Sequence, residues 1–512
     1  MPNVRTPENL IEEMPLRKLV GQTLAVSMKS PIQDKQLGLV EESYIGTLII
    51  PASGFKTAEE IRRATESFQS ASMKVQPGIP SFICSEQEPG LETLPPPATS
   101  FPTSMALTAS RSTRYCYDLA FAVALELRSV GVNMNLAPEV NANQNTNNPR
   151  SVHTFGDDPV LVAKLSSTYV RGLQHGGVSA VAKSFPGRDD SGPDESCKTT
   201  TPRPLEKLLA YDLKPFSECI RVGVDAILLG GTKVIDVDPT KVSALSIKTV
   251  MGLLRNRLGF RGLAVADLRG VAVEPHSAKD ALEAGNDLVI LKEDDIDKGL
   301  EGILSQAKRS RIFARRVREA ALRSLRLKFK RLNHFRRPSL STYGASLHSR
   351  LAQQIANDSI TAVRSGDSIP MKRESPILLV CPILVEGGGK AEQSIFYEAM
   401  RRYSKQIHDH PVNLNPTSDQ IGLVLEQVRR WQNLVLCTLD AHLNDGQAEL
   451  VRKCLEANPS AVLVSMGNPY DLRSLSSQNC IASYGYGKAS LMAAAAVIFG
   501  QIKASGILPI VI

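Results

Sequence analysis

The sequence predicts an α/β protein, a (β/α)8 TIM-like barrel followed by a three-layer α/β/α sandwich domain. Over the first 330 residues, short apolar runs of strand length alternate with longer segments of helical apolar spacing. Such alternation is typical of parallel βαβ units. Seven or eight units in a stretch of about 330 residues suit a closed barrel, with a doubly wound sheet as the alternative.

The barrel strands are expected at seven apolar runs. These are Ile45–Ile50, Ile79–Cys84, Val132–Ala137, Val178–Ser184, Ala226–Leu229, Leu263–Ala266 and Leu288–Leu291. Segments between them carry apolar residues three and four positions apart, as at Pro159–Gly172 and Leu205–Gly223. This spacing predicts helices with one buried face.

A short stretch reading NHFRRPSLSTYG, at 333–344, interrupts the alternation and predicts a linker. We therefore place the barrel domain at 1–335, the linker at 336–345 and the second domain at 346–512. In the second domain, a helix at Leu347–Asn357 precedes further strand and helix patterns. The strands are expected at Ile377–Val380, Leu434–Leu439 and Ala461–Ser465, and the helices at Asp419–Trp431, Asp445–Ala457 and Lys488–Ile502.

The net charge of +8 is concentrated in one stretch, where thirteen Lys or Arg lie between Lys308 and Arg337 with Glu319 as the single acid. A patch for nucleic acid or membrane is one interpretation. Apolar residues run through the same stretch at helical spacing, which favours the solvated face of a helix. The stretch has no zinc-ligand spacing and no glycine-spaced aromatics, so nucleic-acid binding is not expected.

The eight cysteines are at least 17 residues apart, which excludes a C-x-x-C metal or redox pair. The amino-terminal segment has no apolar region of the secretory type, and no apolar run has the length of a membrane span. We therefore expect a cytoplasmic protein that binds no membrane. Neither a P-loop nor a dinucleotide-binding glycine motif occurs, so no cofactor is expected. A homodimer is left open.

Two strand ends carry residues suited to catalysis. The run Leu263–Ala266 ends at Asp267, and the run Val178–Ser184 carries Lys183 before an acidic loop at 188–198. Reacting groups of a parallel barrel lie at such ends. Carboxylates close together raise one another's pKa, as acid/base catalysis requires. Spacing alone equally fits a charged surface loop and a helix-capping aspartate. His408 and His410 lack further ligands at metal spacing and predict a surface strand.

Several segments resemble motifs of one enzyme family, in the same order. LGFRGLAVADL at 258–268 looks like a motif that ends G-F-x-G-…-S-D-D-L, and KSFPG at 183–187 looks like K-H-F-P-G. Further matches begin at 101 (FPTSMALTAS), 131 (GVNMNLAPEVN), 155 (FGDDPVLVAKLSSTYVRGLQ), 440 (DAHLNDGQAELVRKCL), 466 (MGNPYDL) and 483 (SYGYGKASL). The chain thus resembles glycoside hydrolase family 3, in its β-N-acetylglucosaminidase branch. This resemblance implies a barrel with an accessory α/β domain, and retaining cleavage of a β-glycoside.

The resemblance implies that Asp267 is the nucleophile. In this branch a loop histidine, supported by an aspartate, is the acid/base. Here the aspartate falls on Asp194, whereas the histidine becomes Ser196. An ordinary hydroxyl does not store a proton near pH 7, and losing the acid/base typically lowers the rate by about 10²–10⁴. Glu195 or Asp190 could substitute as carboxylic acids.

The substrate contacts implied by the resemblance are also altered. The family's D-Q-E-G-G-R is Glu86-Gln-Glu-Pro-Gly-Leu91, so its first acid is longer and its arginine is lost. The arginine of R-S-F-G becomes a histidine, and a histidine after the glycine becomes an arginine. The predicted substrate-binding residues are Lys183, Glu86, His153, Arg150 and Arg188. Loss of charge-assisted contacts predicts weak affinity for N-acetylglucosamine glycosides.

Three functional hypotheses remain. The first is a working glycosidase with a carboxylate acid/base and an altered sugar site. The second is a barrel enzyme repurposed for a less polar small molecule, because several charged or ring donors are replaced. The third is a non-catalytic pseudoglycosidase. The separation between Asp267 and the loop carboxylates discriminates among them, since a retaining pair lies about 5–5.5 Å apart.

Overall fold

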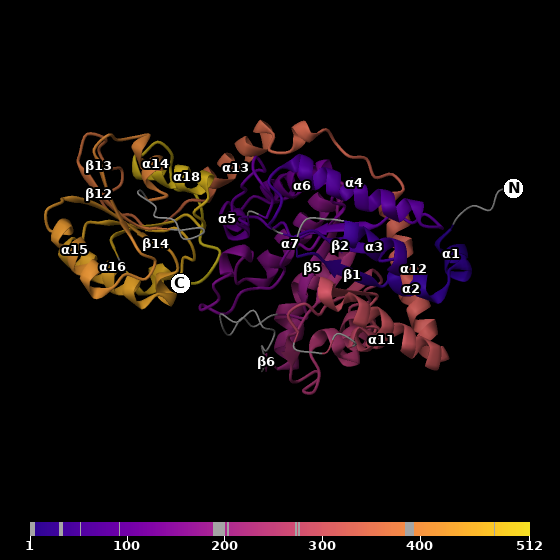
Figure 1. Ribbon diagram of the computed structural model, residues 1–512. Helices are drawn as coiled ribbons and strands as arrows, with labels where there is room; N and C mark the ends of the chain where they lie inside the picture. The colour runs from indigo at the N-terminus through magenta and orange to yellow at the C-terminus, as the bar shows by residue number, and fades with distance from the viewer. Residues whose placement is uncertain are drawn as a thin grey trace.

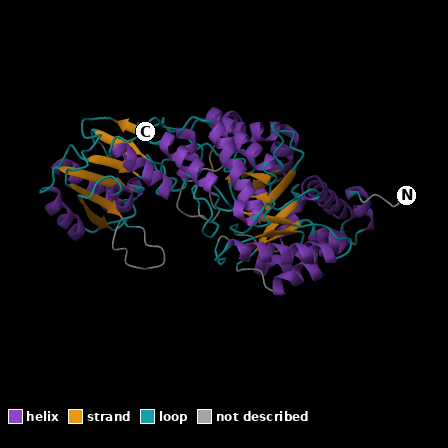
Figure 2. Cartoon of the chain, turned by 90° about the horizontal axis from the view of Figure 1, so that it is seen from above, coloured by secondary structure: helices purple, strands orange, loops and turns teal. Residues whose placement is uncertain are grey.

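The computed structural model describes residues 6–29, 34–51, 53–91, 93–187, 200–201, 204–271, 274, 277–383, 394–475 and 477–512. Figure 1 shows two bodies, a barrel drawn from indigo to salmon and an α/β domain drawn from orange to yellow. Figure 2 shows the two groups of strands, each flanked by helices. Among the described residues, no helix is long and apolar enough to cross a membrane.

The first sheet is a closed barrel with the strand order β1-β10-β9-β7-β5-β4-β3-β2. The alternative of a doubly wound sheet is wrong, because β1 pairs with both β10 and β2 and so leaves no edge. The strands are β1 (Leu24–Ser27), β2 (Thr47–Ile49), β3 (Phe82–Ser85), β4 (Met134–Asn135), β5 (Ser179–Phe185), β7 (Ala226–Leu229), β9 (Leu263–Asp267) and β10 (Leu288–Lys292). Strand β1 was not among the predicted strands; only two residues separate it from α2 (Leu16–Gly21), so its apolar run merges with the helix pattern.

Alternate residues of the barrel strands fill the interior. They form one apolar cluster that includes Ala25, Cys84, Val181 and Val265. The intervening residues face the outer helices and belong to a larger cluster. Because side chains alternate along a strand, every second residue beyond these positions also points toward the barrel axis.

The outer helices follow the strands in order. They are α1 (Pro7–Glu13), α2, α3 (Asp34–Ser43), α4 (Ala58–Lys74), α5 (Ser104–Ala109), α6 (Thr113–Ser129), α7 (Pro159–His175), α8 (Leu205–Lys207), α9 (Leu213–Arg221), α10 (Ala278–Glu283), α11 (Ile296–Arg309) and α12 (Arg311–Leu332). Helix α7 illustrates the local cause: Asp158 caps it by accepting from the amide of Val160, and Pro159 occupies the first turn.

The basic stretch begins at the end of α11 and includes all of α12. Arg311, Arg315 and Arg326 lie on the predicted solvated face, whereas other basic side chains are held by buried carboxylates. On α12, Arg316 and Arg323 donate to Asp287, while Arg331 pairs with Asp225 at 2.6 Å. Both aspartates directly precede barrel strands and are buried. Three of the basic side chains are therefore partners of carboxylates at the amino end of the barrel, which sequence separation hid.

The second domain is a six-stranded sheet with the order β11-β16-β15-β14-β12-β13. Strand β11 is antiparallel to β16, and the other pairs are parallel. The strands are β11 (Thr361–Arg364), β12 (Ile377–Pro382), β13 (Ile407–Val412), β14 (Asn433–Thr438), β15 (Val462–Ser465) and β16 (Asn479–Ala482). His408 and His410 lie on the edge strand β13, as predicted for a surface strand.

Two helical layers cover this sheet and complete the three-layer sandwich. Helices α13 (Ser346–Ser359), α14 (Tyr397–Arg401) and α18 (Lys488–Ile498) pack with one set of alternate strand residues. Helices α15 (Ser418–Val428), α16 (Asp445–Ala457) and α17 (Asp471–Ser474) pack with the other set. The cluster beneath α15 and α16 also includes Met105 and Ala106 of the barrel domain's α5.

Hydrogen bonds at several places join the domains, including one from Thr103 Oγ1 to the Tyr484 carbonyl at 2.7 Å. On α13, His348 Nδ1 lies 2.7 Å from the Glu126 carboxylate of α6. The final segment of the chain returns to the barrel, where the amide of Ile507 donates to Ala109 and that of Val511 donates to the Asp157 side chain. The domain limits of 1–335, 336–345 and 346–512 stay a prediction.

Candidate active site

The predicted site lies at the carboxyl ends of the barrel strands. Interior residues Ala25, Cys84, Val181 and Val265 are each followed, two positions later, by a polar residue. These four residues are Ser27, Glu86, Lys183 and Asp267. Strand alternation therefore directs all four side chains into the barrel mouth. The structure brings together three of the residues predicted from sequence and adds Ser27.

Asp267 is bound by Arg269, two residues further along. The Arg269 amide and Nε donate to Asp267 Oδ1 at 3.1 and 2.9 Å, and Nη2 donates to Oδ2 at 2.6 Å. The same guanidinium donates to Glu86 Oε2 at 3.2 Å and to Oε1 at 2.9 Å. The Asp267 and Glu86 side chains stay 19% and 37% exposed, so both face the open mouth. One arginine thus joins the predicted nucleophile to a predicted substrate-binding acid.

The charges of this group stabilise one another. Burial alone would raise the pKa of Glu86, but hydrogen bonds and charge from Arg269, with Lys183 and Arg150, lower it below its ordinary value. Burial opposes the charged form of Arg269, yet Asp267 and Glu86 raise its pKa. Glu86 and Arg269 are therefore both ionised near neutral pH.

A second ion pair lies beside the first. Lys183 Nζ is 2.8 Å from Glu88 Oε1, and Arg150 Nη2 is 3.6 Å from Glu88 Oε2. Burial opposes the charged form of Lys183, but Glu88, Glu139 and Glu86 raise its pKa. Lys183 is thus a fixed cation whose side chain is 13% exposed. It can donate to hydroxyl groups of a ligand in the mouth.

His153 lies at the edge of the site, next to the second domain. Its Nδ1 is 3.3 Å from the carbonyl oxygen of Pro89. Burial lowers the pKa of His153, although the nearby Glu88 acts in the opposite direction. The imidazole is therefore neutral near pH 7, and cannot replace the charge of the arginine that the family resemblance places there.

A cavity of about 590 Å³ separates this edge from the α/β domain. Its walls include Leu91 and His153 from the barrel domain, and Asp440 and the Gly485–Ser490 segment from the second domain. Burial, followed by the charge of Asp471, raises the pKa of Asp440 to about 6. The second domain thus contributes one wall of the space beside the barrel mouth.

Arg188, Asp194 and Glu195 lie outside the described residues, as do Asp190 and Ser196. Their predicted roles stay predictions. The described part of β5 ends at Phe185, before this loop, and its carboxyl end borders the site.

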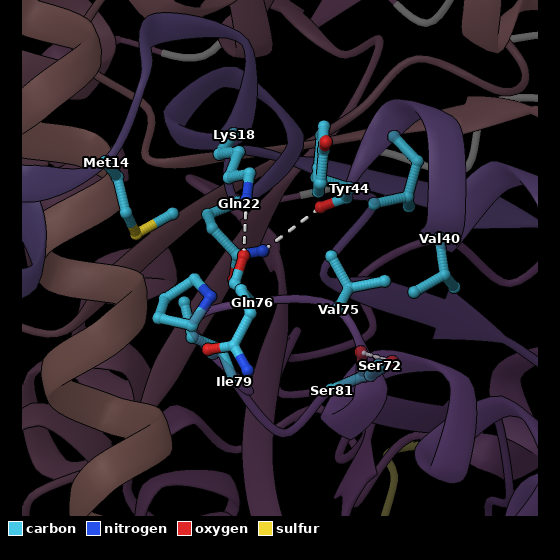
Figure 3. A pocket seen from close by; sticks show the side chains of 12 residues that line it. Met14, Lys18, Gln22, Val40, Tyr44, Ser72, Val75, Gln76, Ile79 and Ser81 are labelled. Atoms are coloured by element: carbon cyan, nitrogen blue, oxygen red, sulfur yellow. Dashed lines mark hydrogen bonds between the residues drawn. The ribbon is translucent and has the colours of Figure 1, made fainter.

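Figure 3 shows a hollow at the opposite end of the barrel. Gln22 and Ile45 come just before β1 and β2, which places the hollow at the amino end. Its volume of about 20 Å³ admits a single water molecule. Gln22 donates to the Tyr44 carbonyl at 3.0 Å, and the hydroxyls of Ser72 and Ser81 are 2.7 Å apart. The hollow is too small for a substrate.

Among the residues that the structure describes, no group of three or more His, Cys, Asp or Glu side chains could hold a metal ion. The chemistry available in the described mouth is that of carboxylates, a lysine and two arginines. A carboxylate can act as a nucleophile or a base, and the cations can hold hydroxyl groups.

Sequence reasoning missed Glu88 and Arg269. Glu88 is the second acid of the Glu86-Gln-Glu segment, and its 2% exposure identifies it as the buried partner of Lys183. Arg269 could have been found by extending the strand alternation from Asp267 by two residues. Its other partner, Glu86, is 183 residues away in sequence, which only the closed barrel brings near.

Comparisons with known proteins agree with this geometry. The model of the glycosyl hydrolase family 3 N-terminal domain matches residues 15–327. β-Hexosaminidase A of Pseudoalteromonas piscicida is 27% identical over 67% of this chain and 64% of its own length, slightly under two thirds of that protein. A β-N-acetylglucosaminidase/β-glucosidase of Cellulomonas fimi is 26% identical over 84% of each chain. The structure of a family 3 β-N-acetylglucosaminidase from Paenibacillus sp. str. FPU-7 has a TM-score of 0.90 at 27% identity, over 97% of this chain and 99% of that one.

Proposed function

The chain belongs to glycosyl hydrolase family 3, and from that premise we propose that it is a retaining β-glycosidase of the β-N-acetylglucosaminidase type with Asp267 as its nucleophile. The observation that carries this proposal is the position of Asp267. It ends β9, points into the barrel mouth, and remains partly exposed beside Lys183 and Glu86. Catalytic residues of such barrels occupy these strand ends.

In the proposed reaction, a carboxylate oxygen of Asp267 bonds to the anomeric carbon of the sugar. The glycosidic carbon–oxygen bond breaks with its electron pair on the leaving oxygen, which takes a proton from the acid/base. Water then adds to the anomeric carbon, gives its proton to the same group, and releases the Asp267 carboxylate. Two displacements retain the configuration of the sugar.

The proton donor proposed for this step is a carboxylic acid of the loop after β5, Glu195 or Asp190. A retaining enzyme needs this group about 5–5.5 Å from the nucleophile. The loop leaves β5 beside β7, and β7 adjoins β9. The strand that precedes the loop therefore lies two positions from the strand that carries Asp267.

Substrate contacts are proposed for Lys183, Arg150, His153 and Glu86, with Arg188 from the loop. Lys183 and Arg150 supply cationic donors, and Glu86 accepts from hydroxyl groups. The names of the relatives, hexosaminidase and N-acetylglucosaminidase, favour an N-acetylhexosamine as the sugar. The neutral His153 provides a weaker contact than an arginine, so low affinity is expected.

The test compares Asp267→Asn with the wild-type protein on aryl β-N-acetylglucosaminides and aryl β-glucosides. The substitution keeps size and hydrogen bonding but removes the nucleophilic charge. We expect kcat/KM to fall about 10⁴-fold or more, the scale of losing a catalytic nucleophile. Asp118→Asn, in an exposed pair with Arg114, is the matched control and should leave the rate unchanged. Equal rates for Asp267→Asn and wild type would refute the proposal.

A second candidate function is a non-catalytic or non-sugar binding role. The observation favouring it is that Arg269 binds both carboxylates which a sugar would need. Absence of turnover for every aryl glycoside, together with a ligand-induced rise in the thermal midpoint, would support this candidate over the glycosidase. An effect of Asp267→Asn on turnover would exclude it.

A further inference from the structure

We propose that Arg269 is a gating residue of the mouth: it blocks Asp267 and Glu86 in the arrangement observed, and swings into an adjacent acidic cavity when a sugar enters. This inference rests on the proposed function. It concerns a residue that the family comparison does not assign, because it lies two positions beyond the nucleophile in this chain's own sequence.

The hydrogen-bond inventory of Arg269 is the first support. A guanidinium has five N–H donors. Here Nε donates to Asp267, Nη2 donates to Asp267 and Glu86, and Nη1 donates to Glu86 and to Ser27 Oγ at 3.4 Å. Every donor is used by the protein itself. All five N–H donors of Arg269 are therefore occupied, and none is left for an anionic group of a substrate.

The observed position also opposes the chemistry. Oδ1 of Asp267 accepts two hydrogen bonds from Arg269 and Oδ2 accepts one at 2.6 Å, so three of the roughly four lone-pair sites of the carboxylate are engaged. The transition state of glycoside cleavage resembles an oxocarbenium ion. A guanidinium beside the nucleophile would repel that positive charge. Both effects require Arg269 to leave before Asp267 attacks.

The alternative position for the Arg269 guanidinium, called the second seat, is a cavity of about 80 Å³ that Arg269 itself borders. Its walls include Arg269 itself and the carboxylates of Glu274 and Asp295. Liquid water takes about 30 Å³ per molecule, so this volume admits a guanidinium group. In the described part of the chain, neither Glu274 nor Asp295 has a side-chain hydrogen bond or ion pair. Two carboxylates are thus available to replace the two that Arg269 would leave.

Without substrate, the Arg269 guanidinium favours its observed position, beside Asp267 and Glu86, over the second seat. Lys292 also lines the cavity, and its positive charge opposes entry of the guanidinium. A sugar in the mouth reverses this balance, because its hydroxyl groups donate to Glu86 and Asp267 in place of Arg269. Exchange of one carboxylate pair for another keeps the charge compensated throughout. Substrate binding and release of the nucleophile are then one coupled event.

The kinetic test is a double-mutant cycle on the full chain. Arg269→Met removes the blocking charge, and Glu274→Gln with Asp295→Asn removes the second seat. We expect Arg269→Met to raise kcat/KM for an aryl β-N-acetylglucosaminide about tenfold or more, since it removes the charge-assisted hydrogen bonds that hold the nucleophile. The seat variant should lower kcat/KM in the wild-type background and have no effect in Arg269→Met. Arg269→Lys should lie between wild type and Arg269→Met.

A fall in kcat/KM for Arg269→Met, or equal effects of the seat variant in both backgrounds, would overturn the gate. Arg114→Met, on the exposed surface, is the matched control for loss of an arginine. Thermal midpoints establish that each variant is folded.

A chemical readout separates the gate from the proposed function. A water-soluble carbodiimide with glycine ethyl ester labels accessible carboxyl groups, and mass spectrometry of peptides measures the labelling of Asp267. Arg269→Met should increase its labelling rate about tenfold over Arg114→Met. An unchanged rate would overturn the gate. If labelling rises but no variant cleaves any glycoside, the gate stands and the proposed glycosidase function fails.

Discussion

At the amino end of the barrel, Asp287 is completely buried and paired with three arginines, whereas at the carboxyl end Asp267 shares one arginine with Glu86 and is 19% exposed. The arginines of Asp287 come from α12 and from the helix before β9, at 2.5–2.8 Å. The amide of Ala264 donates to the same carboxylate. Both ends contain carboxylates and cations, but only one end is open.

The difference lies in whether partners can be exchanged. Removing a buried carboxylate that has several fixed partners destabilises the protein, because the charges of the partners are left uncompensated. A partly exposed carboxylate with one flexible partner can exchange it for water or a hydroxyl group at little cost. The amino end should therefore determine stability, and the carboxyl end should determine activity.

Asp287→Asn tests the amino end and should have the largest effect on stability. Three arginines lose their counter-ion in a buried setting, so we expect the free energy of unfolding to fall by about 3–5 kcal/mol. Chemical denaturation measures this loss. The folded protein should retain its kcat/KM, because Asp287 precedes β10 and lies at the far end from the mouth. A loss of activity in fully folded Asp287→Asn would contradict the assignment of stability to the amino end and activity to the carboxyl end.

Glu88→Gln tests the deepest carboxylate of the mouth. Lys183 loses its 2.8 Å partner, which is the group that most raises its pKa. Glu139 and Glu86 still compensate part of the charge, so the stability loss should be smaller than for Asp287→Asn. We expect kcat/KM to fall about 10²-fold, because a misplaced lysine no longer orients the sugar. Glu449→Gln, in an exposed pair with Lys453, is the control and should be silent in both assays.

Lys328→Met tests a buried lysine at the amino end of the barrel. Lys328 Nζ donates to Gln22 Oε1 and the Gly46 carbonyl at 2.7 and 2.8 Å, and burial lowers its pKa to about 7. Between pH 7 and 10.5 the unfolded chain binds this proton and the folded chain does not. The free energy of unfolding should therefore rise with pH, by at most about 1.4 kcal/mol per pH unit, from this group. The difference between wild type and Lys328→Met isolates that slope; identical slopes would contradict the prediction.

Asp440→Asn, at the cavity between the domains, should have the smallest effect. The pKa of Asp440 is raised to about 6 from 3.8, so between these values the folded chain binds more protons than the unfolded chain. Its contribution to stability is therefore present at low pH and lost as pH rises to 6. Above pH 7, Asp440→Asn should stabilise the protein by about 1–2 kcal/mol. Thermal midpoints of Asp440→Asn and wild type at pH 4 and 7.5 measure this difference. A higher midpoint for the variant at pH 4 alone would contradict the prediction.

The sequence predicted seven barrel strands because each is a nearly continuous apolar run, which burial on both faces requires. It missed β11 and β16, whose short runs at or beside the sheet edge carry a weaker apolar signal. Asp267, Lys183 and Glu86 were predictable as strand ends. The pairing of Arg269 with Glu86 was not, because only barrel closure brings these two residues together.

The α/β domain meets the barrel over a broad contact. Hydrogen bonds cross it through α13, through the Thr103 hydroxyl and the Tyr484 carbonyl, and through the returning chain near Ile507. Helix α5 of the barrel domain also belongs to the apolar cluster beneath α15 and α16. A contact of this breadth gives the second domain no axis of easy rotation, so the two domains should behave in solution as one body. Removing residues 507–512 takes away one of these contacts, and small-angle scattering should then show an unchanged distribution of shapes.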